Sequence, residues 1–248
     1  MNSTGNQSTT VGTPNFKDLQ NAAEDFRYLL NRGYPRRAAL ELVGNRYQLI
    51  SDHRQLLHRG VFSDADSESR QKKRISIGRI RNRDLAIDGY NVIITIEAGL
   101  SGRPLILGDD GFIRDISGLS GNFRKTERTE EALQWVLDAL KKATPRQSLF
   151  LFDAPISNSG KLAQEVRTRL KKDDLSGDAK AVKVPEKILI GYPGLVATSD
   201  TAIIDRSKEV VDLAGDILKN LQFRSGSAGA ATHSFISWRR KRGPFGRT

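Results

Sequence analysis

The stretch Leu85-Ala86-Ile87-Asp88-Gly89-Tyr90-Asn91 decides the predicted fold. Its short apolar run lies between a charged segment, 81–84, and Gly89, which is typical of a buried strand that ends at Asp88. We expect Gly89 to permit a sharp turn, after which the apolar residues of 92–96 continue as a buried helix. Ligands bind at the carboxyl ends of strands in open α/β sheets, so Asp88 is a candidate site residue. The alternative role for Asp88 is to cap the helix that follows.

The same pattern of an apolar run followed by an aspartate occurs twice more. Residues 149–152 lead to Asp153, and residues 195–199 lead to Asp200. Further strands are expected at 105–107, 181–184 and 210–213, and helices at 130–142 with Thr129 as the cap, at 162–170 and at 216–221. Strands that alternate with helices predict an α/β protein in which helices flank a parallel sheet.

Three aspartates at one edge of a parallel sheet imply a concentration of negative charge. If Asp88, Asp153 and Asp200 converge, protons or cations must compensate their charges. Mg²⁺ or Mn²⁺ with oxygen ligands suits this requirement and is the usual arrangement for phosphodiester chemistry. Alternatively, some of these carboxylates cap helices or pair with arginines.

Composition narrows the classes of function. The 248 residues carry a net charge of +11, with no cysteine and three histidines. Disulfides, thiolate zinc sites and cysteine nucleophiles are therefore excluded, and a histidine metal cage or a Ser-His-Asp site is disfavoured. No apolar run is long enough to span a membrane, and a chain without cysteine fits a reducing cytoplasm. Positive charge is concentrated at 16–83 and 224–248, whereas 84–223 is slightly acidic, which favours basic arms that hold a polyanion.

Composition also divides the chain into five segments. They are a leader expected to be disordered (1–15), a small all-helical basic domain (16–62), a basic linker (63–83), an α/β domain (84–223) and a basic tail expected to be disordered (224–248). The helices of the basic domain form either a helix-turn-helix-like binder or a plain cap that packs on the α/β domain.

Basic residues in three of these segments are candidate nucleic-acid contacts. They are Arg36, Arg37, Arg46, Lys72, Lys73, Arg74, Arg239, Arg240, Lys241 and Arg242. The alternative for the linker cluster is a solvated face. In the tail, Phe235 and Trp238 lie close to the basic residues, a pattern that suits stacking on single-stranded nucleic acid.

The acidic segments resemble the successive motifs of PIN-like nucleases, in particular those of the NYN branch. The motifs are Ile87-Asp88-Gly89-Tyr90-Asn91, Phe152-Asp153-Ala154 and Ala197-Thr198-Ser199-Asp200, and the similarity extends from about Leu85 to Leu221. A basic helical segment before such a domain is also similar to an uncharacterised, mainly archaeal family. The resemblance implies a Rossmann-like fold and metal-dependent cleavage of RNA.

By this resemblance, the catalytic residues are Asp88, Asn91, Asp153 and Asp200, and the three aspartates bind Mg²⁺ or Mn²⁺. Thr198 and Ser199 support Asp200. A further acid often comes from a helix in these nucleases, and its candidates here are Asp110 and Asp205, besides Asp109 and Glu165.

We therefore expect a metal-dependent ribonuclease. The alternative is a non-catalytic RNA-binding or ribonucleoprotein-associated adaptor with a degenerate PIN-like domain. A complete acidic ring would favour the enzyme, and an acid of the ring that is paired with an arginine would favour the adaptor.

Overall fold

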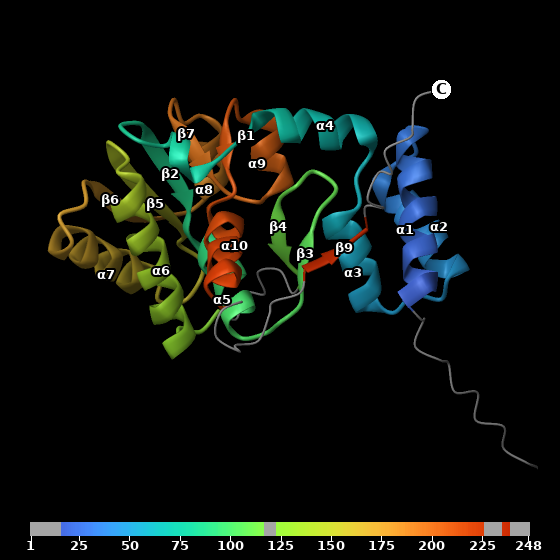
Figure 1. The fold of residues 1–248 in the computed structure, drawn as a ribbon, viewed down its shortest axis with the longest axis horizontal. Coiled ribbons are helices and arrows are strands. Elements are labelled where there is room, and N and C mark those ends of the chain that lie inside the picture. Colours follow the sequence, from blue (N-terminus) through green and yellow to red (C-terminus); the bar gives the residue numbers. More distant parts are fainter. Residues whose placement is uncertain (1–15, 117–122, 226–234, 239–248) are drawn as a thin grey trace, which may run out of the picture.

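The structure, a computed structural model, describes residues 16–116, 123–225 and 235–238. An N-terminal group of helices, a small sheet and a larger α/β part follow one another along its longest axis (Figure 1). The expected leader at 1–15 and the basic cluster at 239–242 lie outside the described residues.

The first three helices pack around an apolar core of their own. They are α1 (Phe16–Asn31), α2 (Arg36–Arg46) and α3 (Ser51–Gly60). In α1, helical spacing brings Leu19, Ala22 and Phe26 onto one buried face. Gly33, with φ 79°, allows the chain to reverse between α1 and α2. The predicted helical N-terminal region is therefore confirmed.

A three-stranded sheet with the order β4-β3-β9 lies against these helices. It consists of β3 (Leu105–Leu107), β4 (Ile113–Asp115) and β9 (Phe235–Ser237). Strand β3 runs antiparallel to β4 and parallel to β9, and Ile106 and Trp238 are buried in the core of the N-terminal helices. The predicted strand 105–107 thus exists but does not belong to the main sheet.

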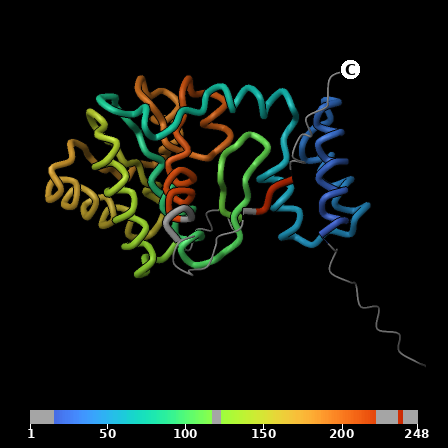
Figure 2. Tube along the Cα trace, viewed as in Figure 1, coloured from blue at the N-terminus to red at the C-terminus, as the bar shows by residue number. Residues whose placement is uncertain are grey.

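The described part of the tail contradicts the expectation of disorder. Residues 235–237 form β9 beside β3, and Trp238 is only 6% exposed and stacks against Phe16. Figure 2 shows this short red segment far from α10 and next to the green hairpin. Trp238 is consequently a core residue and cannot stack on a base, as its position among basic residues had suggested.

The main sheet has six strands, and every neighbouring pair is parallel. Its order is β1-β8-β7-β2-β5-β6. The strands are β1 (Arg74–Ile75), β2 (Asp84–Asp88), β5 (Gln147–Asp153), β6 (Gly177–Val182), β7 (Leu195–Ala197) and β8 (Val210–Val211). The predicted parallel sheet and the three strands that lead to Asp88, Asp153 and Asp200 are confirmed.

Helices cover both faces of the main sheet. One apolar core contains residues of α5 (Gly89–Leu100), α6 (Glu127–Ala143), α7 (Ser159–Lys172) and α10 (Leu213–Ser225). The opposite face packs against the short helices α8 (Pro185–Ile190) and α9 (Thr201–Arg206). Helix α6 begins three residues earlier than expected, because Thr126 is its cap and forms a capping box with Thr129.

The expected basic linker is instead part of the folded structure. Residues 64–73 form α4, the turn η1 spans Ile77–Arg79, and β1 pairs with β8 at one edge of the main sheet. Figure 1 shows α4 passing from the N-terminal helices to the α/β part. Two of its basic residues, Arg70 and Lys73, are held by acidic side chains and backbone carbonyls of the α/β part, as described below, so they order the segment.

Gly89 is required for a reason other than the one expected. It is the first residue of α5 and directly follows β2, so the chain turns sharply there as expected, but without the positive φ that would demand glycine. A Cβ atom at this position would lie 2.3 Å from Cε1 of Phe152. The absence of a side chain therefore allows α5 to pack closely against β5.

Candidate functional site

Three neighbouring strands bring the predicted carboxylates to one edge of the main sheet. Asp88 ends β2, Asp153 ends β5, and Asp200 follows β7 after two residues. Strand β2 lies between β5 and β7, and adjacent strands are about 4.8 Å apart. From β2 the chain first adds β5 and β6 on one side, and it then adds β7 and β8 on the other side of β2. The boundary between β2 and β7 is therefore a switch point, and ligand crevices form at such points in open α/β sheets.

The three carboxylates interact electrostatically. Asp88 is only 8% exposed, and its burial, followed by the charges of Asp200 and Asp153, raises its pKa to about 7. The hydroxyl of Thr198 and the backbone N–H of Asn91 oppose this rise. Burial also raises the pKa of Asp153, which is half-buried, whereas Asp200 is exposed. A cation at this edge would relieve the cost of ionising Asp88.

Hydrogen bonds hold the loop after β7 against the end of β2. The Thr198 hydroxyl donates to Oδ2 of Asp88 at 2.9 Å and accepts from the backbone N–H of Asp200 at 3.1 Å. The side-chain oxygen of Asn91 accepts from both the backbone N–H and the hydroxyl of Ser199, at 2.9 and 3.1 Å. Asn91 therefore positions the loop, and Thr198 connects two of the three acids.

Asp200 also has a structural role. Its Oδ1 accepts hydrogen bonds from the backbone N–H groups of Ala202 and Ile203, at 2.8 and 3.2 Å, and so caps α9. Its other oxygen, Oδ2, makes no hydrogen bond within the described residues. Asp88, by contrast, precedes α5 but makes no side-chain capping hydrogen bond of normal geometry, and the N–H of Asn91 only lowers its pKa, so the capping alternative holds for Asp200 and not for Asp88.

A cavity of about 930 Å³ borders this edge on the side of Asp200. Asn91, Ser199 and Asp200 form one wall, and residues of α3 that include His53 and Arg59 form another. The Nδ1 atom of His53 is buried without a hydrogen-bond partner among the described residues. The N-terminal helices therefore contribute directly to the surroundings of the carboxylates.

The candidates for a fourth acid are not available for a cation. Asp110 accepts two hydrogen bonds from Arg114, at 2.8 and 2.7 Å, and one of 3.4 Å from Arg70. Although burial alone would raise the pKa of Asp110, Arg114 and Arg70 hold it below its usual value. Asp205 pairs with Arg70 through both of its oxygens, at 2.6 and 2.9 Å. The expectation that these two acids serve as ligands is therefore wrong.

The other two acids are also engaged. Asp109 accepts two hydrogen bonds from Arg27, at 2.8 and 2.9 Å, and Glu165 lies in ion pairs with Lys125 and Arg169. Within the described ranges, no three acidic or histidine side chains form a ready-made metal cluster.

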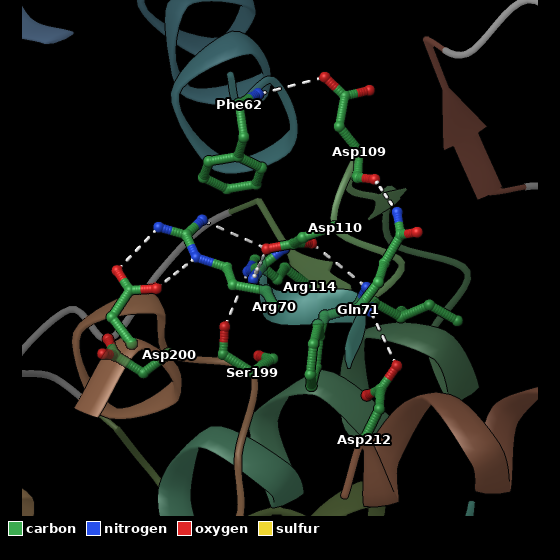
Figure 3. A network of polar contacts seen from close by, with 12 residues as sticks. Phe62, Arg70, Gln71, Asp109, Asp110, Arg114, Ser199, Asp200 and Asp212 are labelled. Carbon is green, nitrogen blue, oxygen red and sulfur yellow. Dashed lines mark hydrogen bonds and ion pairs between the residues drawn. The ribbon is translucent and has the colours of Figure 1, made fainter. Parts of the chain in front are cut away.

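The arginines that occupy these acids form a buried network that was missed in the sequence (Figure 3). The guanidinium carbons of Arg70, Arg36 and Arg114 lie 4.5, 4.7 and 5.1 Å from the ring centre of Phe62. Arg114 also donates to the backbone carbonyl of Ser199 at 2.8 Å, which links the network to the loop that carries Asp200. The four-residue spacing from Asp110 to Arg114 is the one signal in the sequence for this pair.

The predicted nucleic-acid contacts fall into two groups. Arg36, Lys73 and Arg74 bind within the protein: Arg36 donates to the carbonyl oxygens of His58 and Val61, Lys73 to those of Ile204 and Asp205, and Arg74 to Asp216. Arg37, Arg46 and Lys72 are exposed, although Arg46 pairs with Asp25 and Lys72 with Glu68. The first group is engaged within the protein, which leaves it less available to a nucleic acid, and contacts by either group remain a prediction.

The fold and this edge define an α/β protein with a parallel sheet and a carboxylate-bearing crevice. None of the helices in the described part of the chain is long and apolar enough to cross a membrane. The chain belongs to the DUF5616 family, a domain of unknown function, whose model matches residues 77–216. A second model, DUF434, a protein of unknown function, matches residues 18–73.

A relative from Methanocaldococcus jannaschii is similar over most of its length. This protein, described as uncharacterized protein MJ0935, is 33% identical over 206 residues, which cover 82% of the present chain and 98% of the relative. No solved structure matches the chain significantly.

Proposed function

We propose that the protein is a divalent-metal-dependent ribonuclease with a PIN-like active site at the carboxyl edge of β2, β5 and β7. The observation that carries this proposal is the position of Asp88, Asp153 and Asp200 at the ends of three neighbouring strands, where burial, and then the charges of Asp200 and Asp153, raise the pKa of Asp88 to about 7. No arginine or lysine pairs with any of the three among the described residues. A buried carboxylate without a cationic partner is costly for the fold, so its presence suggests a function.

The available oxygens fit Mg²⁺ or Mn²⁺. The charges of Asp153 and Asp200 both act on Asp88, and Oδ2 of Asp200 makes no hydrogen bond within the described residues. Mg²⁺ commonly binds to one or two carboxylates together with water and substrate phosphate. A complete protein cage is therefore not needed. When bound, such an ion would neutralise the carboxylates and stabilise negative charge on a phosphodiester.

The remaining residues of the site orient these acids. Thr198 holds Asp88 by its hydroxyl, and Asn91 holds Ser199 and thus the direction of the loop that ends at Asp200. The net charge of +11 supports a polyanionic substrate. RNA is the substrate that the resemblance of the acidic motifs implies, and a cytoplasmic location is part of the same proposal.

The second candidate function is a non-catalytic RNA-binding adaptor. It is favoured by the observation that Arg70 and Arg114 neutralise the two acids, Asp110 and Asp205, that were expected to complete the ring. In this reading, the three remaining carboxylates are insufficient for catalysis.

Cleavage of a labelled single-stranded RNA in Mn²⁺ separates the two functions. We expect the parent to cleave and Asp200→Asn to lose at least about 10²-fold in rate, because one negative charge that faces the cation is removed. Asp174→Asn is the matched control: Asp174 is exposed, has φ 53°, which asparagine tolerates, and lies before β6 at the opposite edge of the sheet. If the highly purified parent and both variants show the same residual rate of cleavage, or if none of them cleaves RNA with Mg²⁺ or Mn²⁺, the nuclease proposal is wrong and the adaptor proposal replaces it.

A further inference from the structure

A second cavity, of about 630 Å³, lies beside Asp153 on the side of α7. Tyr90, Phe123, Asn158 and Lys161 are among the residues that line it. Tyr90 is close enough to Asp153 for the charge of Asp153 to contribute, after burial, to a pKa of about 12 for the phenol. The turn that leads from Asp153 to Asn158 is closed by a hydrogen bond of 3.1 Å from the N–H of Ile156 to the carbonyl of Asp153. This cavity is therefore next to the carboxylate edge, on the other side from the cavity at α3.

The basic side chains that line this second cavity suit the binding of an anion. Arg124 and Lys161 line the cavity, are exposed, and make no ion pair or hydrogen bond with any described residue. Lys125 and Glu165 also line the cavity, and there Lys125 is paired with Glu130 and Glu165, so these side chains compensate one another. Two uncompensated cations thus face a space that adjoins an acidic site.

The start of α7 adds hydrogen-bond donors. Because α7 follows β5 in the chain, it begins at the carboxyl end of that strand, near Asp153. Asn158 precedes the helix with φ 63°, and its side chain makes no capping hydrogen bond. The N–H groups of Gly160 and Lys161, in the first turn of a helix of 14 residues, therefore lack the usual side-chain acceptor.

An independent observation comes from the hydroxyl of Tyr90. The side chain is 1% exposed, lines the cavity, and its hydroxyl has no hydrogen-bond partner among the described residues. Its ring is fixed edge-on against Phe152 and Phe123, with centroids 5.2 and 4.9 Å away. The hydroxyl is therefore a buried donor without an acceptor among the described residues.

We propose that this cavity is a phosphate subsite, which binds a phosphate of an RNA strand through Lys161, Arg124, the first N–H groups of α7 and the hydroxyl of Tyr90. The inference rests on the proposed function, because it makes this phosphate a neighbour of the one held at Asp88. An internal phosphodiester and a terminal phosphate share this chemistry. If the subsite binds a terminal phosphate, binding of the RNA at this cavity requires a free 5′-phosphate, whereas an internal phosphodiester does not require one.

Binding of a fluorescent single-stranded RNA of ten nucleotides, with and without a 5′-phosphate, tests the subsite in EDTA, where no cleavage occurs. We expect Lys161→Ala to weaken binding and to lower the slope of log affinity against log salt by about 0.7, the value for one contact to a single strand. Lys172→Ala removes the same charge from the exposed end of the same helix and should leave the slope unchanged. A dependence on Lys161 that requires the 5′-phosphate supports a terminal phosphate, and a dependence without it supports an internal one.

Two further measurements protect the test against indirect effects. Tyr90→Phe removes only the hydroxyl, and it should weaken RNA binding severalfold, whereas a hydroxyl without a ligand would leave affinity unchanged. In amide NMR spectra of the full chain, inorganic phosphate should shift the signals of Gly160 and Lys161. Equal effects of Lys161→Ala and Lys172→Ala, or no effect of Lys161→Ala and Tyr90→Phe, overturn the subsite. Neither result bears on cleavage in Mn²⁺, so the subsite and the nuclease can fail separately.

Discussion

Replacement of Asp88 by asparagine should stabilise the protein above neutral pH. The folded state raises the pKa of Asp88 from 3.8 to about 7, so it favours the protonated form. The contribution of Asp88 to the free energy of unfolding should therefore be highest at pH 4 and below, fall as the pH rises through 7, and level off near pH 8. The difference between the two pKa values corresponds to a loss on the order of 4 kcal/mol. The amide of the Asp88→Asn variant has no charge to desolvate and can still accept from Thr198, so this variant should escape most of the loss.

Urea unfolding in EDTA at pH 5, 6, 7 and 8 measures the effect. The free energy of unfolding of Asp88→Asn minus that of the parent should grow from pH 5 to pH 7 and approach a constant value near pH 8. Asp174→Asn should follow the parent at every pH, because it removes an exposed charge at the other edge of the sheet. Parallel curves for Asp88→Asn and the parent would refute the reasoning, since they would show that ionisation of Asp88 carries no penalty in the fold.

Three further substitutions test the packing that positions the site. Gly89→Ala should cost about 1–3 kcal/mol in urea unfolding, because its Cβ would lie 2.3 Å from Phe152, and Phe152→Leu in the same chain should recover part of the loss. Arg70→Leu should cost about 3–5 kcal/mol, since it leaves the buried Asp110 with one partner; a loss below about 1 kcal/mol would contradict the role given to the network. Trp238→Ala should cost about 3–5 kcal/mol in the same assay, whereas a tail without a fold would tolerate it.

The sequence predicts most of the main sheet because its central strands have clear boundaries. Each of β2, β5 and β7 is a short apolar run followed by a polar residue, and this pattern is enough to place Asp88, Asp153 and Asp200 at the same edge. No local pattern in the sequence predicts the order of the strands in the sheet. Strand β7 pairs with β2, which brings Thr198 to Asp88, and this pairing depends on the fold of the whole chain.

The errors have a common physical cause. A run of arginines and lysines has the same sequence pattern whether its side chains contact water, phosphate or buried aspartates. Only the fold shows that Arg70 and Arg74 form ion pairs with acidic side chains. The segment 235–238 was assigned to the tail because three strand residues give no periodic signal. Its partner, β3, is 130 residues away, as the pairing of Leu105 with Phe235 shows. Non-local pairing of this kind is invisible to an argument from composition.

The buried ion pairs bear on how the two family matches relate to each other. Arg70 belongs to the stretch that matches DUF434, whereas Asp110 and Asp205 belong to the stretch that matches DUF5616. Because Arg70 is 6% exposed and Asp110 is fully buried, separating the two stretches would leave charges without partners, which is far more costly than losing an exposed ion pair. The N-terminal helices also line the cavity next to Asp200. The two stretches therefore form one folded unit, and the environment of the carboxylates is a property of both.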